Sequence, residues 1–173
     1  MIDLKTRHKI NWKEKRISVL GAGISGIAAS KLGKFIGASI FISDHNKNNT
    51  IKEKIEGFEY ELGGHTSKVL EADLVIISPG VPSDSSIIEK CIQSNIPIVS
   101  EIEFASWFTS SPIIALTGSN GKTTTVNLIY EMCISDGMNS LLGGNIGVPF
   151  SDNVLWELTS NIQNTTHILE LSS

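Results

Sequence analysis

The sequence has few cysteines, no long apolar run and no excess of basic residues, and each shortage excludes a class of protein. Only two cysteines occur in 173 residues, Cys91 and Cys133. They lie far apart and match no metal-ligand spacing, so we expect buried free thiols rather than a disulfide framework. No apolar run reaches the roughly 20 residues that span a bilayer, and the N-terminus lacks the apolar segment of a secretory signal. The sequence therefore predicts a soluble, cytoplasmic protein with no membrane partner.

The charge balance argues against a nucleic-acid partner. The chain has 14 Lys and Arg residues against 18 Asp and Glu residues, a formal net charge of −4. General nucleic-acid binders usually present a basic face, which this composition does not supply. With 40% hydrophobic residues, the chain can bury a sizeable core. We expect a globular protein that does not bind nucleic acid.

Short β-rich runs alternate with segments of helical period, which is typical of parallel βα units. The runs predict strands at 16–20, 38–43, 58–62, 73–77, 98–100, 113–116, 140–142 and 167–171. Helices are expected at 24–36, in the charged stretch up to about residue 56, and at 84–94, 101–109 and 122–135. The first helix is expected to place one apolar face inward, formed by Ile24, Ile27, Ala28, Leu32 and Phe35. The fold class is α/β.

The pattern restarts after Ser110-Ser111-Pro112, which predicts a domain boundary near 108–112. We expect a Rossmann-like domain with a parallel sheet at 1–108, and the truncated start of a P-loop ATP-binding α/β domain at 109–173. The second unit would hold about three strands, fewer than the ~4–6 of a usual sheet. We therefore expect a fragment of a longer protein, with an exposed sheet edge and without a C-terminal domain.

The first chemical motif is the G-x-G-x-x-G loop Gly21-Ala22-Gly23-Ile24-Ser25-Gly26, between a predicted strand and helix. Such glycines allow a tight turn and a close approach of the backbone to a diphosphate, and the helix N-terminus attracts the anion. Asp44 ends the next strand, near the ~20-residue offset at which an acid contacts a ribose. Taken alone, this half predicts an NAD site, another nucleotide diphosphate site, or a glycine turn that only packs.

The second motif, Thr117-Gly118-Ser119-Asn120-Gly121-Lys122-Thr123-Thr124, is more specific. Backbone N–H groups of 118–121 would wrap the β-phosphate of ATP, Lys122 would bridge the β- and γ-phosphates, and Thr123 would coordinate Mg²⁺. Position 116 is Leu, where the standard phosphate loop has its first glycine. The fixed residues of the pattern T-G-x-N-G-K-T still recur together by chance only on the order of 10⁻⁵ per chain. The loop predicts ATP binding.

Two other segments follow predicted strands. Gly143-Gly144-Asn145-Ile146-Gly147 falls at the carboxyl edge of the sheet, where ligands bind in open α/β folds, unless it is a plain glycine loop. Glu170 ends the apolar strand at 167–171, where a carboxylate can supply a Mg²⁺ ligand. Its alternative is a strand-end carboxylate that faces solvent.

Together, the segments GAGISGIAA, ISPGVP, TGSNGKTTT, GGNIG and LELSS resemble the Mur ligases of bacterial cell-wall synthesis, over about residues 17–173. The TGxNGKT loop is shared with folylpolyglutamate synthases, whereas the glycine loop, the SPG turn and GGNIG favour the D-glutamate-adding branch. Two alternatives stay open: another ligase of this superfamily, or a non-catalytic module that binds NAD or another nucleotide.

The resemblance implies an ATP- and Mg²⁺-dependent amide ligase that adds D-glutamate to UDP-N-acetylmuramoyl-L-alanine in peptidoglycan biosynthesis. The alanine carboxylate would attack the γ-phosphorus to give an acyl phosphate, and the D-glutamate amine would displace phosphate. Lys122 and Glu170 would be the catalytic residues of this chain. We expect the full-length enzyme to be monomeric. We expect the chain alone to be inactive, because the family also needs a downstream His and a carbamylated Lys.

The same resemblance implies the binding residues. The diphosphate would contact Gly23, Ile24 and Ser25, the uridine Asp44 and His45, and the nucleotide cleft would include Ser78, Pro79 and Gly80. The muramoyl-alanine part would contact Asn145 and Ser172. ATP would be held by Gly118, Ser119, Asn120, Gly121, Lys122, Thr123 and Thr124, with Thr123 and Glu170 as the metal ligands.

Overall fold

The computed structural model describes residues 9–172 except 48, 83, 161 and 163, so residues 1–8 and 173 at the ends of the predicted domains lie outside the described part. The described chain forms two parallel sheets, with strand orders β3-β2-β1-β4-β5 and β6-β8-β7. This α/β architecture is the predicted fold class.

The strands of the first sheet are β1 (Arg16–Leu20), β2 (Ser39–Asp44), β3 (Glu59–Leu62), β4 (Leu74–Ile77) and β5 (Ile98–Ser100), and those of the second are β6 (Ile113–Leu116), β7 (Asn139–Gly144) and β8 (Thr165–Glu170). The α-helices are α1 (Ile24–Phe35), α2 (Asn49–Lys54), α3 (Ser86–Gln93), α4 (Glu101–Ser106), α5 (Lys122–Ser135) and α6 (Phe150–Thr159). Short 3-10 helices occur at η2 (Trp12–Glu14) and η3 (Ser67–Glu71).

The first sheet reverses its direction of growth between β1 and β4. From β1 the chain adds β2 and β3 on one side, and then β4 and β5 on the other. Leu20 at the end of β1 is paired with Ile77 of β4 and with Ser43 of β2, so the loops after these strands meet at one edge. A ligand crevice forms at such a switch point in open parallel sheets.

Both faces of the first sheet are covered. One buried cluster joins alternate residues such as Val19 and Ile76 to α1 and α4. The other joins residues such as Phe41 and Val75 to α3 and η3. Because neighbouring residues on a strand point to opposite faces, a strand that is apolar throughout needs cover on both sides.

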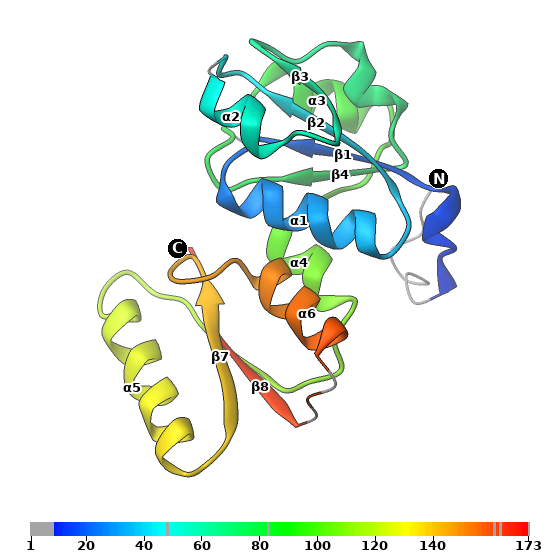
Figure 1. Ribbon diagram of the computed structural model, residues 1–173. Coiled ribbons are helices and arrows are strands. Elements are labelled where there is room, and N and C mark those ends of the chain that lie inside the picture. The colour runs from blue at the N-terminus through cyan, green and yellow to red at the C-terminus, as the bar shows by residue number, and fades with distance from the viewer. Residues whose placement is uncertain (1–8, 48, 83, 161, 163, 173) are drawn as a thin grey trace.

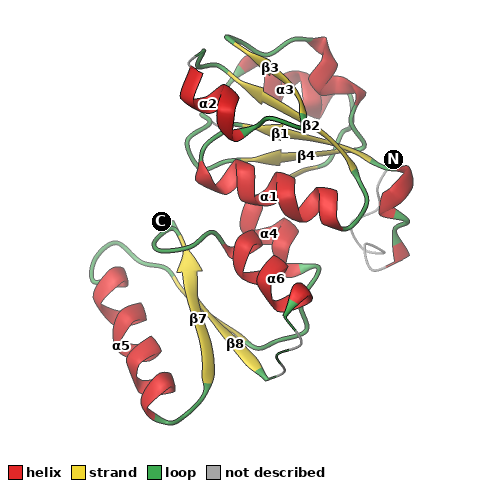
Figure 2. Ribbon diagram, in the orientation of Figure 1, coloured by secondary structure: helices red, strands yellow, loops and turns green. Residues whose placement is uncertain are grey.

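Helices α1, α4 and α6 lie between the two sheets (Figure 2). Helix α6 packs against α1 and α4, which belong to the first sheet, and also against β7 and β8 of the second. Its buried Phe150 and Val154 join the same apolar cluster as Leu32 of α1 and Phe104 of α4. The predicted boundary at 108/109 falls in the segment between α4 and β6. Apolar contact across α6 therefore fixes how the two units are arranged.

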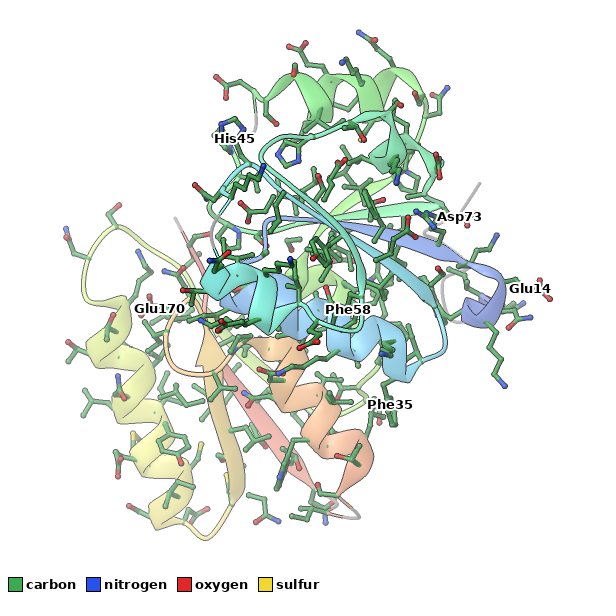
Figure 3. All side chains as sticks on the ribbon, turned by 45° about the horizontal axis from the view of Figure 1, so that its top comes forward. Glu14, Phe35, His45, Phe58, Asp73 and Glu170 are labelled. Atoms are coloured by element: carbon green, nitrogen blue, oxygen red, sulfur yellow. The ribbon has the colours of Figure 1, made fainter. Side chains whose placement is uncertain are left out.

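The strand predictions are confirmed with small shifts at the ends, but the sequence reading missed helix α6 entirely. The predicted inner face of α1 was also partly wrong. Ala28 and Leu32 are fully buried, whereas Ile24 and Phe35 are 73% and 52% exposed, and Figure 3 shows Phe35 at the outer edge of the molecule. Gly26 and Ser30 face the sheet instead, because small residues let α1 approach the strands closely.

The second sheet is less covered than the first. Ile113 and Ile114 of its edge strand β6 are 41% and 38% exposed, and Leu128 and Met132 on the outer side of α5 are 60% and 71% exposed. An exposed sheet edge was predicted, and β6 is one of the two edges.

The predictions for the cysteines and for membrane-spanning segments can be compared with the structure. Both cysteines are free, but only Cys91 is buried, whereas Cys133 is partly exposed on α5, which corrects the expectation for that thiol. Within residues 9–172 as described, we find no helix with the length and hydropathy of a membrane span.

Candidate functional site

A cleft of about 1290 Å³ is lined by residues of both units. Figure 1 shows the arrangement of the two sheets, with the C-terminus close to the loop between β1 and α1. The cleft is lined by all of the residues that the sequence reading assigned to the UDP substrate, namely Gly23, Ile24, Ser25, Asp44, His45, Ser78, Pro79, Gly80, Asn145 and Ser172. The last two come from the second unit and the others from the first. A ligand in this cleft would therefore touch both units.

The glycine loop after β1 forms one wall of the cleft. Gly26 is a steric requirement, because a Cβ there would overlap the carbonyl oxygen of Gly21. Gly23 is different: it caps α1 with an extended backbone (φ −72°, ψ −176°), and a Cβ there would meet nothing within 4 Å. No side chain of the described residues caps α1, so its first N–H groups face open space that an anion can occupy.

Asp44, predicted to bind ribose or uridine, is used within the protein. It is 7% exposed. Its Oδ2 accepts a 2.5 Å hydrogen bond from the backbone N–H of Ala22, and its Oδ1 accepts a 2.7 Å bond from the N–H of Asn46. The carboxylate thus ties the glycine loop to the end of β2. Each oxygen keeps a second lone pair for a ligand.

Ser78 fastens the same loop from the other side. Its hydroxyl donates to the carbonyl oxygen of Gly21 at 3.2 Å, and its backbone N–H donates to Leu20 at 3.0 Å. Asp44 and Ser78 therefore hold the loop from both neighbouring strands, which leaves little freedom at this wall of the cleft.

His65 and Glu101 also line the cleft, and the sequence reading missed both. His65 follows β3, and its Nδ1 lies 2.6 Å from the hydroxyl of Ser43. The histidines show no ligand spacing in sequence, so no local signal marked His65. Only the pairing of β3 with β2 brings it to Ser43.

Glu101 begins α4 and is 3% exposed. Its Oε1 accepts a 2.5 Å hydrogen bond from the backbone N–H of Ser151, in the first turn of α6. Burial raises the pKa of Glu101, and the charge of Asp152 adds to this, against the lowering effect of the bonds from Ser151. A carboxyl group of the first unit thus caps a helix of the second.

The predicted ATP loop runs directly into the first residue of α5. Gly121 caps α5 in the left-handed region (φ +74°), which is strained for other residues. The backbone itself therefore requires glycine at this position. No side chain within the described residues caps α5. Lys122 Nζ donates to the carbonyl oxygen of Gly118 at 2.5 Å.

The two predicted metal ligands lie together. Thr123 Oγ1 donates to Glu170 Oε2 at 2.7 Å, and Glu170 is 3% exposed. Figure 3 labels Glu170 at the end of the second sheet, next to the first turn of α5. Asn145 Nδ2 lies 3.4 Å from Glu170 Oε1, and the Asn145 N–H donates to the Glu170 carbonyl at 2.8 Å. Asn145 thus links this pair to the cleft, although residues 118–124 do not line it.

The donor set at this pair suits magnesium. A hydroxyl and a carboxylate supply hard oxygen ligands, the type that Mg²⁺ prefers, with nucleotide phosphates and water completing the shell. Among the described residues, no group of three or more His, Cys, Asp or Glu side chains is placed to hold a metal ion. Thr123 and Glu170 would therefore bind magnesium together with a phosphate ligand rather than as a site made only of protein.

Comparison with known proteins identifies the first unit. Residues 15–100 match the family described as Mur ligase MurD-like, N-terminal domain. The chain is 38% identical over 171 residues to the UDP-N-acetylmuramoylalanine–D-glutamate ligase of Salinibacter ruber. The alignment covers 93% of this chain and 36% of the relative. It is 43% identical over 163 residues to the enzyme of the same name from Christiangramia forsetii. This alignment covers 92% of this chain and 36% of the relative.

Solved structures with the same fold include a murein peptide ligase from Psychrobacter arcticus, with a TM-score of 0.55 at 20% identity over 92% of this chain and 37% of that one. A pseudomurein peptide ligase from Methanothermus fervidus gives a TM-score of 0.51 at 22% identity over 92% of this chain and 33% of that one. At these identities the likeness concerns the fold alone. The chain spans about a third of the length of the curated relatives, 36% in both cases above.

Proposed function

The chain belongs to the Mur ligase family, with a MurD-like N-terminal domain at residues 15–100, and from this premise we propose that it binds the nucleotides of an ATP-dependent ligase. The reaction is the addition of D-glutamate to UDP-N-acetylmuramoyl-L-alanine, the activity named for its relatives. We place this activity in the cytoplasm, in peptidoglycan synthesis and, through the cell wall, in cell shape and division.

The observation that carries the proposal is the shared cleft. Residues of two motifs far apart in the sequence, at 21–26 and 143–147, line one cavity of about 1290 Å³. A UDP-linked substrate is long, with a diphosphate in its middle, and needs such an extended cleft. The uncapped start of α1 at Gly23 offers N–H groups to the diphosphate. The muramoyl-alanine end would then lie toward Asn145 and Ser172.

In this proposed orientation, the reacting carboxylate of the substrate would lie near the ATP loop. Asn145 lines the cleft and is also bonded to Glu170, which in turn accepts from Thr123. ATP, when bound, supplies the γ-phosphoryl group that activates the alanine carboxylate before the D-glutamate amine displaces phosphate. Mg²⁺, when bound, neutralises negative charge on the phosphate oxygens.

Lys122 and the loop at 118–124 would bind the phosphates of ATP. The Lys122 ammonium lies on the first residue of α5, where its charge and the helix N-terminus both favour phosphate. Lys122 Nζ contacts the carbonyl oxygen of Gly118, and we expect it to exchange that contact for phosphate oxygens. Glu170 and Thr123 would bind Mg²⁺ next to the same phosphates. Residues 118–124 form the ATP site of the proposal.

Calorimetric titration of the chain tests the proposal. UDP-N-acetylmuramoyl-L-alanine and MgATP are each expected to bind, whereas NAD is expected not to bind at the glycine loop. Tight binding of NAD with no binding of the UDP ligand would favour an NAD-binding module and overturn the proposal. Binding of the UDP ligand with no binding of MgATP would limit it to the first unit.

A further inference from the structure

A chain of hydrogen bonds fixes which nitrogen of His65 carries its proton. Glu61 Oε1 accepts from the hydroxyl of Ser43 at 2.7 Å, and the same hydroxyl oxygen lies 2.6 Å from His65 Nδ1. Thr66 donates to Glu61 through both its N–H and its hydroxyl, at 2.9 Å and 2.6 Å. Every member of this chain has a partner inside the protein, so the arrangement is built rather than incidental.

The carboxylate of Glu61 determines the direction of the hydrogen bonds between Glu61, Ser43 and His65. Burial alone would raise the pKa of Glu61, but hydrogen bonds from Thr66 and Ser43 outweigh it and hold the pKa below its usual value. An ionised Glu61 can only accept, so the single proton of the Ser43 hydroxyl points to Glu61. Ser43 must then accept from His65, whose Nδ1 carries a hydrogen.

His65 is also held in its neutral form. Burial lowers its pKa from the usual value, and the nearby His45 adds to the effect, while Glu61 and Asp44 act in the opposite direction. A neutral ring with its proton on Nδ1 has an unprotonated Nε2, which is a hydrogen-bond acceptor. The fully buried Ser43 occupies the Nδ1 atom of the ring. His65 is one of the residues that line the cleft, so Nε2 is the ring nitrogen left to accept a hydrogen bond from a ligand there.

The strand order places this acceptor at the outer end of the cleft. The diphosphate position at Gly23 follows β1, Asp44 ends the neighbouring β2, and His65 follows β3, the next strand outward. A nucleoside diphosphate that lies across these strand ends places its ribose near Asp44 and its base near His65. His65 is only partly buried, so solvent can pair with its Nε2, and a base that displaces this solvent should offer an N–H group in its place.

We propose that His65, oriented by Ser43 and Glu61, is a specificity-determining residue that accepts a hydrogen bond from the ring N–H of a uracil base through Nε2. This inference rests on the proposed function, which makes the cleft a UDP site. Uracil has one ring donor, its N3–H, and methylation at N3 removes it.

The test compares UDP with N3-methyl-UDP by calorimetric titration of the chain. The wild-type chain is expected to bind UDP roughly five- to tenfold more tightly, the effect of about one hydrogen bond. His65→Ala should bind both ligands with similar affinity. His65→Gln, which can present a carbonyl acceptor, should restore part of the preference. Ser43→Ala should reduce the preference without removing the ring.

Because each variant is judged by the ratio of two ligands, a general loss of binding does not imitate the result. Equal affinity of the wild-type chain for the two ligands would overturn the assignment of His65, and so would an unchanged ratio in His65→Ala. If the wild-type chain binds neither ligand, the UDP site itself is wrong, and the proposed function falls with it.

Discussion

The hydroxyl of Thr123 donates a 2.7 Å hydrogen bond to Glu170 Oε2, which joins the first turn of α5 to the carboxyl end of β8. The two residues are 47 positions apart in the chain. Two oxygen ligands are thereby brought together next to the phosphate loop. The contact also gives each of them a partner before any nucleotide binds, so that neither polar group is left unpaired.

Replacing Glu170 by Gln should weaken the binding of MgATP. The substitution keeps the size of the side chain and an acceptor for Thr123 but removes the negative charge that Mg²⁺ needs. We expect the affinity for MgATP to fall roughly tenfold, or about 1.4 kcal/mol. Titration calorimetry with and without EDTA measures the effect, which should disappear when the metal is chelated. Glu131→Gln, which removes a charge from the exposed side of α5, is the matched control. Unchanged MgATP affinity in Glu170→Gln would remove this residue from the metal site.

Two of the three glycines of the first loop, Gly23 and Gly26, should respond differently to alanine. At Gly26 a Cβ would overlap the carbonyl oxygen of Gly21, so Gly26→Ala should lower the free energy of unfolding by about 1–3 kcal/mol. At Gly23 the space is open and the backbone is extended, so Gly23→Ala should change stability by less than about 1 kcal/mol.

The Gly23→Ala substitution should weaken ligand binding although it leaves stability nearly unchanged. Its alanine variant should fold normally yet lose affinity for UDP, because the new methyl group stands where the diphosphate approaches the start of α1. Urea denaturation and UDP titration on the same samples separate the two effects. Normal UDP affinity in Gly23→Ala would mean that the diphosphate does not lie against this residue.

The sequence predicted the glycine loop, the phosphate loop and most strands because their signals are local. Glycine spacing in 21–26 and continuous apolar runs such as residues 74–77 depend only on neighbouring residues. All predicted substrate residues therefore fell on one cleft once the strands were in place. The direction in which helix α1 buries its side chains was less predictable. Ile24 is exposed because the first turn of α1 opens onto the cleft rather than onto the sheet.

Other features depend on partners distant in sequence. Helix α6 was missed because no side chain caps it at Pro149, and the N–H of Ser151 is satisfied by Glu101, 50 residues away. His65 acquires its role only through Ser43, which the pairing of β2 with β3 brings close. No single-sequence pattern encodes these contacts, since they depend on which strands become neighbours.

The buried carboxyl of Glu101 should make stability fall as pH rises. Its pKa in the folded chain is raised above the unfolded value of 4.5, so above that pH the folded state binds more protons than the unfolded state. Its stabilising contribution is therefore fully present below about pH 4.5 and is lost as pH rises through the folded pKa.

Glu101→Gln keeps an acceptor for Ser151 without a buried charge, so it should equal or exceed the wild type in stability at pH 8. Glu101→Ala removes the cap and should lose about 0.5–2 kcal/mol at pH 5 and less at pH 8, where the contribution of Glu101 is already reduced. Urea denaturation at pH 5 and pH 8 measures both, with the exposed Glu53→Gln as the control. A Gln variant that is less stable than the wild type at pH 8 would show that Glu101 is ionised and stabilising there.

Glu157 on α6 should produce the opposite dependence on pH. Its carboxylate accepts hydrogen bonds from Thr109 and from His167 Nε2, both at 2.8 Å, and from Ser111. Burial alone would raise the pKa of Glu157, but the bonds from Ser111, His167 and Thr109 outweigh it and lower the pKa. The unfolded chain therefore binds more protons in acid, and stability is lost as pH falls below the unfolded value of 4.5 toward the folded pKa.

Glu157→Gln should cost about 1–3 kcal/mol at pH 7, because charge-assisted bonds to the segment before β6 and to β8 become neutral. The difference from the wild type should shrink between pH 5 and pH 3, as protonation removes the same charge from the native residue. Chemical denaturation across this range measures it, with Glu131→Gln as a variant of equal charge change. A difference that stays constant down to pH 3 would mean that the packing of Glu157, and not its charge, holds the segment to α6.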